Sequence, residues 1–115
     1  MKVAASIDII ENPVTDTEAE NVFMKMLAGP ADGAGNFFLR QFRVAPGGHT
    51  PLHRHDWEHE VFILSGRGEV HSVQGPRTIA AGDVVFIPPG ERHQFKNTGA
   101  SDLEFLCIVP AFSDS

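Results

Sequence analysis

Cysteine and basic residues are scarce in this chain, and their scarcity excludes several classes of protein. Cys107 is the single cysteine among 115 residues, so an intrachain disulfide framework is excluded, and one thiol fits a reducing compartment. Nine Lys and Arg against 15 Asp and Glu give a formal net charge of -6, and no basic run occurs. This balance argues against nucleic acid or an anionic membrane as a partner. Small molecules are the expected partners.

Long apolar runs are also absent. No segment approaches the length needed to cross a bilayer, and residues 1–11 lack both a basic region and a long apolar stretch. We therefore expect a soluble, cytoplasmic protein. A chain of 115 residues can build one hydrophobic core but not a second, so residues 1–115 are expected to form a single domain without a separate cofactor domain.

Short strands dominate the pattern of the sequence. Apolar and polar residues alternate over short runs that Gly and Pro interrupt, which is typical of an all-β protein. Strands are expected at 22–28, 36–45, 49–55, 60–65, 69–74, 83–87, 93–97 and 102–109. Turns are expected at 29–35, 46–48, 66–68, 75–76, 88–90 and 98–99. Such strands usually close into a barrel or a two-sheet jelly roll with a cavity between the inner faces.

Apolar residues occur on both faces of two of these strands. If His59 points inward, the period of two turns Val61 and Ile63 inward and leaves Phe62 and Leu64 outside, where they are too apolar for water. The strand at 102–109 behaves alike. A second layer must therefore cover the outer face. We expect a homodimer, in which the N-terminal segment could be exchanged between chains; coverage by the chain termini within a monomer is the alternative.

Histidines are concentrated in one segment, where three imidazoles occupy seven positions. His53 and His55, one residue apart on an extended strand, would point the same way, and His59 can return to the same ion after a short bend. His93 follows the proline-glycine turn at 88–90, near the start of a strand. The segment therefore predicts most of a metal site, whereas two other histidines, His49 and His71, are expected to be ordinary amphipathic residues.

These residues resemble the two signature motifs of the cupins. The first motif is Gly47, five residues, His53-Arg54-His55, three residues, His59 in the usual glutamate position, six residues and Gly66; the second is Gly82, five residues, Pro88-Pro89-Gly90, two residues, His93, three residues and Asn97. The resemblance implies a cupin jelly-roll β-barrel, a double-stranded β-helix, with one divalent transition metal inside. Residues 57–62 are most similar to small single-domain bacterial cupins that bind manganese or another metal through four histidines, here His53, His55, His59 and His93.

Histidine at position 59 changes the chemistry of such a site. A neutral imidazole in place of a carboxylate leaves the charge of the ion uncompensated and makes it a stronger Lewis acid. Glu60 is a poorer candidate for that ligand, because adjacent strand residues point oppositely and only five residues then precede Gly66. Glu58 and Glu60 either accept an imidazole N–H or are solvated.

Four imidazoles suit zinc, copper, iron or nickel, and manganese is suggested by the resemblance alone. An octahedral ion keeps two positions for other ligands, whereas a tetrahedral zinc keeps none and would only stiffen the barrel. By strand parity, the surrounding pocket is expected to be lined by Phe95, Phe105, Cys107 and Val109, with Thr50 and Arg40 as polar contributors. The two Phe residues could instead be plain core, and the thiol inert.

Three functions remain. The first is a metal-dependent oxidoreductase of dioxygenase type acting on a small, largely apolar or phenolic substrate. The second is a metal-dependent isomerase or lyase acting on a small oxygenated acid or sugar, with Arg40 or a histidine handling charge. The third is a non-catalytic module that binds metal or a small ligand. Apolar pocket walls favour the first, several convergent polar groups the second, and the lack of a cavity the third.

Overall fold

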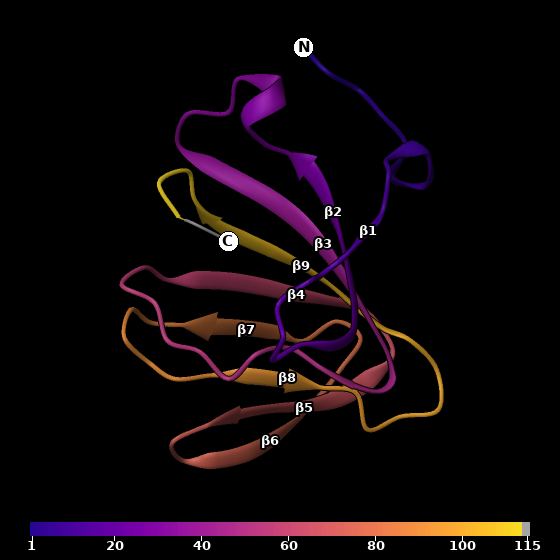
Figure 1. Cartoon of the computed structure of the whole chain (residues 1–115), viewed down its shortest axis with the longest axis vertical. Coiled ribbons are helices and arrows are strands. Elements are labelled where there is room, and N and C mark those ends of the chain that lie inside the picture. The colour runs from indigo at the N-terminus through magenta and orange to yellow at the C-terminus, as the bar shows by residue number, and fades with distance from the viewer. Residues whose placement is uncertain (114–115) are drawn as a thin grey trace.

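The computed structural model describes residues 1–113, whose nine strands form one curled sheet (Figure 1). The strands are β1 Asn12–Pro13, β2 Glu20–Ala28, β3 Phe37–His49, β4 His59–Ser65, β5 Arg67–Ser72, β6 Gly75–Ala80, β7 Val84–Ile87, β8 Gln94–Lys96 and β9 Leu103–Pro110. Two short 3-10 turns, η1 Ser6–Asp8 and η2 Pro30–Asp32, are the helical elements of this part of the chain. No helix in it is long and apolar enough to span a bilayer.

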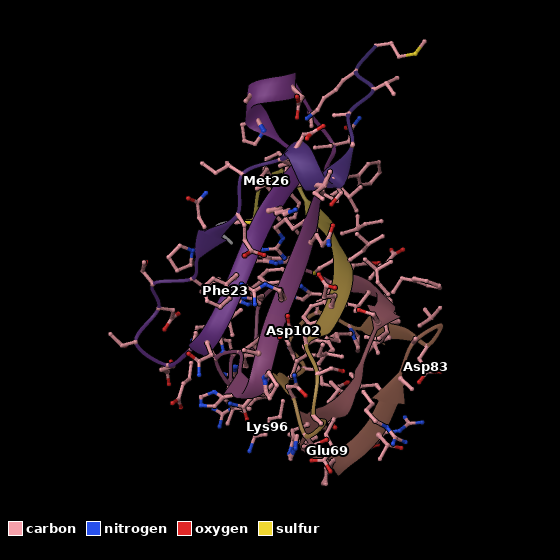
Figure 2. All side chains as sticks on the ribbon, turned by 90° about the vertical axis from the view of Figure 1, so that its right-hand side faces the viewer. Phe23, Met26, Glu69, Asp83, Lys96 and Asp102 are labelled. Atoms are coloured by element: carbon pink, nitrogen blue, oxygen red, sulfur yellow. The ribbon has the colours of Figure 1, made fainter. Side chains whose placement is uncertain are left out.

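The sheet is antiparallel and its strand order differs from the chain order. The order is β6-β5-β8-β3-β9-β4-β7, and β2 pairs with β3 beside this path. Figure 1 shows β9 between β3 and β4, although the chain forms it last. The long strand β3 curves strongly enough to pair with β2, β9 and, at its end, β8. This curvature, visible from the side in Figure 2, gives the sheet a concave inner face.

Strict alternation places the side chains of β4 and β9. In β4, Val61 and Ile63 are buried and Phe62 is 44% exposed, as the period of two predicts. In β9, alternate residues from Leu103 to Val109 are buried. Together with inward residues of β3, they form the core inside the curled sheet, and each fully buried aliphatic side chain contributes about 1.5–3 kcal/mol. The predicted all-β barrel fold is thus confirmed.

The prediction of a strand at 49–55 is wrong. Strand β3 runs through 46–48 to His49, and residues 50–58 form a loop with one isolated bridge between His53 and His93. Positions 46–48 form a bulge rather than a turn, because the four β3 residues between Val44 and His49 lie opposite a single β2 residue, Asn21. Gly47 adopts the left-handed conformation, with φ of 79°, that this bulge requires.

The hairpin of β5 and β6 also differs from the expectation. The turn lies at Val73-Gln74 rather than at 75–76, because Ser72 pairs directly with Gly75. Strand β6 was not predicted, since its sequence contains Pro76, Arg77 and Thr78 and lacks apolar alternation. An edge strand tolerates this composition, and β6 is at one end of the strand order.

Candidate metal centre

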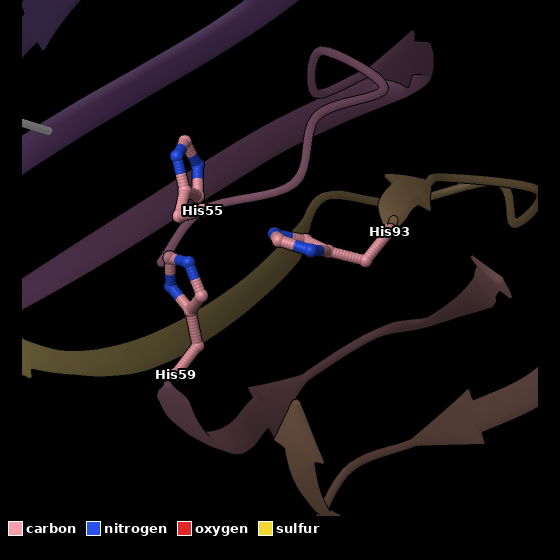
Figure 3. A group of neighbouring side chains, drawn as sticks. All are labelled: His55, His59 and His93. Carbon is pink, nitrogen blue, oxygen red and sulfur yellow. The ribbon is translucent and has the colours of Figure 1, made fainter. Parts of the chain in front are cut away.

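Three of the four predicted histidines converge inside the sheet. His59 is the first residue of β4, His93 immediately precedes β8, and His55 comes from the loop between β3 and β4. One ring nitrogen of each lies within 4.8 Å of those of the other two. Figure 3 shows His93 approaching from one side and His55 and His59 from the other. This spacing lets three imidazoles bind one ion after small rotations of their rings.

Nδ1 of His59 and Nδ1 of His93 already contact other groups, which leaves Nε2 of each ring for an ion. His93 donates from Nδ1 to the carbonyl of Glu91 at 3.0 Å. Nδ1 of His59 lies 3.4 Å from Sγ of Cys107. Nε2 of His59 is buried and has no hydrogen-bond partner. A buried nitrogen without a partner is costly, and a metal ion at the cluster would satisfy it. The donor set therefore fits a transition metal.

Burial keeps two of these imidazoles, those of His59 and His93, neutral at neutral pH. Burial lowers the pKa of His59 to about 3, helped by the neighbouring charges of His93, Arg40 and His55. Burial likewise lowers the pKa of His93, although its hydrogen bond to Glu91 opposes the shift. Neutral imidazole is the form that binds a metal ion, so both side chains are ready to act as ligands at neutral pH.

His53 lies beside the cluster but faces a different partner. Its Nε2 is 2.9 Å from a carboxylate oxygen of Glu18 and 3.9 Å from one of Asp16. Its ring centroid lies 5.8 Å from that of His55. The expectation that His53 and His55 point the same way assumed an extended strand, and a loop occupies those positions instead. The two backbone hydrogen bonds to His93, at 2.8 and 3.2 Å, still hold His53 next to the cluster.

A cavity of about 460 Å³ opens above the histidines. Five of the six predicted pocket residues line it: Phe95, Phe105, Cys107, Thr50 and Arg40. Val109 lies on the same face of β9 and is 1% exposed, but it is packed in the core opposite Phe38 and is not among the lining residues. Three Phe rings pack together in the wall: the ring of Phe105 stacks on Phe42 at 5.4 Å and on Phe95 at 4.6 Å.

Sequence reasoning missed several lining residues. Trp57 stacks on His55, with ring centroids 4.7 Å apart and planes at 8°. Phe42 follows Arg40 at a spacing of two in β3, so the parity argument applied to β9 could have found it. Asp16 belongs to the acidic stretch at 16–20; it is exposed, yet it lines the cavity. No local pattern indicates that this loop meets His53.

The other titratable residues considered from the sequence do not line the cavity. Glu58 and Glu60 interact with each other, and this raises the pKa of Glu58. His71 pairs with Glu69 at 2.9 Å on β5, which agrees with an ordinary role for it. His49 ends β3 and is not among the lining residues. None of these groups supplies a general base to the cavity.

The motifs, the curled sheet and the histidine cluster agree with the family comparison. The family described as "Cupin domain" matches residues 40–109, more than half of the chain. The chain belongs to the cupin family. The cupin is 43% identical over 76 residues to the 1-methylthio-D-xylulose 5-phosphate methylsulfurylase of Rhodospirillum rubrum, with 66% of this chain and 49% of the relative covered. It is 41% identical over 70 residues to the oxalate-binding protein of Thermotoga maritima, with 60% and 58% covered.

Among solved structures, the cupin is similar to the polyketide cyclase RemF from Streptomyces resistomycificus. The TM-score is 0.94 at 32% identity, and the match covers 100% of this chain and 82% of the other. The chain spans only about half the length of the two curated relatives. Because these proteins carry different named activities on one scaffold, the family establishes the fold and leaves the reaction to the site.

Proposed function

We propose that this cupin binds one divalent transition metal at His55, His59 and His93, with His53 as a fourth ligand, and acts as a dioxygenase-type oxidoreductase on a small, largely apolar or phenolic substrate. The observation that carries the proposal is the buried, unpartnered Nε2 of His59 beneath an aromatic cavity. We propose manganese first, by resemblance to the four-histidine cupins; iron, nickel, copper and zinc suit the same imidazoles. His53 would have to turn from Glu18 to join the set.

The chain's own residues would bind and orient the substrate. The bound metal would act as a Lewis acid, and a redox-active metal would also supply an electron for the activation of dioxygen. Phe42, Phe95 and Phe105 would stack against a planar apolar body and keep water from the histidines. The hydrogen bonds from Nδ1 of His93 and of His59 would hold both rings in the orientation that a ligand needs.

Oxygen uptake tests the reaction class. We expect the metal-loaded protein, given a panel of small phenols and apolar alkenes, to consume dioxygen with at least one of them, and the His93→Ala variant to consume none above background. An oxygen electrode coupled to product analysis by mass spectrometry measures this. Conversion of a substrate at an equal rate under argon would contradict the dioxygenase proposal.

A second candidate is a non-redox, Lewis-acid reaction such as ring closure. The likeness to the polyketide cyclase over the whole chain favours it. So does Arg40, a charged group within the cavity that could handle a developing negative charge. The anaerobic arm of the same experiment separates the two reactions. Binding without turnover in either arm would favour the non-catalytic module, the class that the Thermotoga relative's name describes.

A homodimer is the proposed assembly. The outer face of β4, β7 and β9 carries an apolar patch of Phe62, Val84, Phe86, Leu106 and Ile108. Phe62 pairs with Val84 and Leu106 on the neighbouring strands, and Phe86 and Ile108 flank Glu60. The N-terminal segment leaves the patch exposed. Ser6 bonds to Gln41, beside Leu106 on the same outer face, and Lys2 bonds to Leu27, while Phe62, Val84, Phe86 and Ile108 remain 39–72% exposed. A second copy of the chain would bury the patch without needing a different surface.

A matched pair of valine substitutions tests this assembly. Val84→Glu places a charge in the patch, whereas Val73→Glu places one in the isolated β5–β6 turn; the two valines are 72% and 80% exposed. We expect light scattering at micromolar concentration to give a dimer for the wild type and Val73→Glu and a monomer for Val84→Glu. A monomeric wild type, or a Val84→Glu variant that remains fully dimeric, would rule out this interface.

A further inference from the structure

Arg40 is a buried cation that has no anionic partner among the described residues. It lies on β3 and lines the cavity, and only 3% of it is exposed. Within residues 1–113, no Asp or Glu oxygen comes within 4.0 Å of its guanidinium. Arginine stays protonated in proteins, so the charge cannot be relieved by loss of a proton. A buried, uncompensated charge is strongly destabilising.

The contacts of Arg40 compensate this charge only in part. Its Nη2 donates to Sγ of Cys107 at 3.3 Å, and its guanidinium carbon lies 5.0 Å from the ring centroid of Phe42. A thiol sulfur is a weak acceptor, and the ring supplies a modest cation-π attraction. Nε is buried and makes no hydrogen bond. Donor capacity therefore remains on the side chain inside the cavity.

The neighbouring arginine shows what a paired guanidinium looks like in the same strand. Arg43 faces the other side of β3, where it contacts Glu11 at 2.8 Å and Asp102 at 3.4 Å and stacks on Phe23. It is half-buried and still has two carboxylates. Arg40 is far more buried and has none. The charge of Arg43 is therefore balanced by carboxylates of the described chain, whereas the charge of Arg40 is not.

The position of Arg40 relative to the histidines suggests what would complete it. Sγ of Cys107 contacts Nη2 of Arg40 on one side and Nδ1 of His59, at 3.4 Å, on the other. The guanidinium and the histidine cluster are thus separated by a single sulfur atom. Among the described lining residues the one carboxylate is Asp16, which is exposed and lies by His53. The Arg40 end of the cavity is therefore positive and lined by aromatic rings.

We propose that Arg40 binds the carboxylate of a small aromatic acid within the cavity, with the aromatic body of the acid packed against Phe42, Phe95 and Phe105. This assignment names the substrate class of the proposed function and rests on it. A planar guanidinium matches the two oxygens of a carboxylate, and a charge-assisted pair of this kind is strong where water is excluded. The cavity of about 460 Å³ has room for such a molecule.

Calorimetric titration of metal-free protein with benzoate and with neutral benzyl alcohol tests the assignment at pH 8, in a buffer without phosphate or carboxylate. We expect the wild type to bind benzoate at least about tenfold more tightly than benzyl alcohol. In Arg40→Gln this preference should vanish while benzyl alcohol binds as before. Arg77→Gln, which removes the same charge from the exposed strand β6, should keep the preference.

Each outcome separates this assignment from the metal proposal. Equal binding of the two compounds by the wild type, a comparison that needs no variant, would overturn the role of Arg40. So would an unchanged benzoate preference in a folded Arg40→Gln. If Arg40→Gln does not fold, Arg40→Lys, which keeps the charge but loses the two-pronged geometry, should weaken benzoate more than benzyl alcohol. A benzoate preference in a protein that binds no metal would refute only the metal site.

Discussion

The His93→Ala variant is expected to lose stoichiometric metal binding at neutral pH, with an affinity lowered by about 100-fold or more. Changes to residues that merely orient a ligand already cost 10–100-fold, and this change removes a ligand. The backbone bonds between His93 and His53 need no side chain, so the local fold should persist. Elemental analysis of protein that has been loaded with metal and then gel-filtered into metal-free buffer measures the metal retained per chain.

Other histidine variants make the result specific. His59→Ala is expected to behave like His93→Ala, because both rings belong to the cluster. His53→Ala should cause a smaller loss, since its ring is paired with Glu18 in this structure. His71→Ala deletes the same group from β5, where it contacts Glu69, and should keep one ion per chain. One tightly held ion per chain in both His93→Ala and His59→Ala would place the metal elsewhere.

The Gly66→Ala substitution is expected to destabilise the fold by about 3 kcal/mol or more. Gly66 joins β4 to β5 with φ of 84°, a conformation that costs an alanine about 1–2 kcal/mol. An added Cβ would also run into the backbone carbonyl of Asp102 and lie 2.9 Å from Cα of Leu103, which is the first residue of β9. Backbone on both sides would have to move apart, which adds to the cost. Urea unfolding followed by circular dichroism measures the loss.

Gly75→Ala provides the matched control. Gly75 has φ of 96° in the β5–β6 hairpin, and nothing lies within 4 Å of an added Cβ. It should therefore show only the conformational cost of about 1–2 kcal/mol. If the two variants lost equal stability, close approach of β9 to Gly66 would not be what requires glycine there.

Strand parity succeeded where one face of a strand is buried. In β4 and β9 the core selects alternate residues, so the inward positions of Val61, Ile63 and Cys107 followed directly from the sequence. That argument took the inward direction of His59 as its premise, and His59 and Arg40 both line the cavity. The inward positions in β4 and β9 are fixed by a period that the chain itself displays.

The positions of the side chains in the loops could not be predicted from the sequence. His53 and His55 lie in a loop, where residues one apart need not point the same way, and so the pair divides between Glu18 and the histidine cluster. The contact between the loop at 14–18 and the loop at 51–57 is long-range and has no periodic signature. Trp57 reaches the cavity in the same manner, through stacking on His55. Tertiary contacts between irregular segments had to come from the structure.

Metal content and coordination in protein purified without an affinity tag test the central claim most directly. Elemental analysis, combined with X-ray absorption spectroscopy at the metal edge, gives the stoichiometry and the ligand atoms. The account predicts about one manganese, iron, nickel, copper or zinc ion per chain, bound by three or four imidazole nitrogens with at least one open position. Protein that binds no divalent transition metal even after loading, or binds one through oxygen ligands alone, would contradict it.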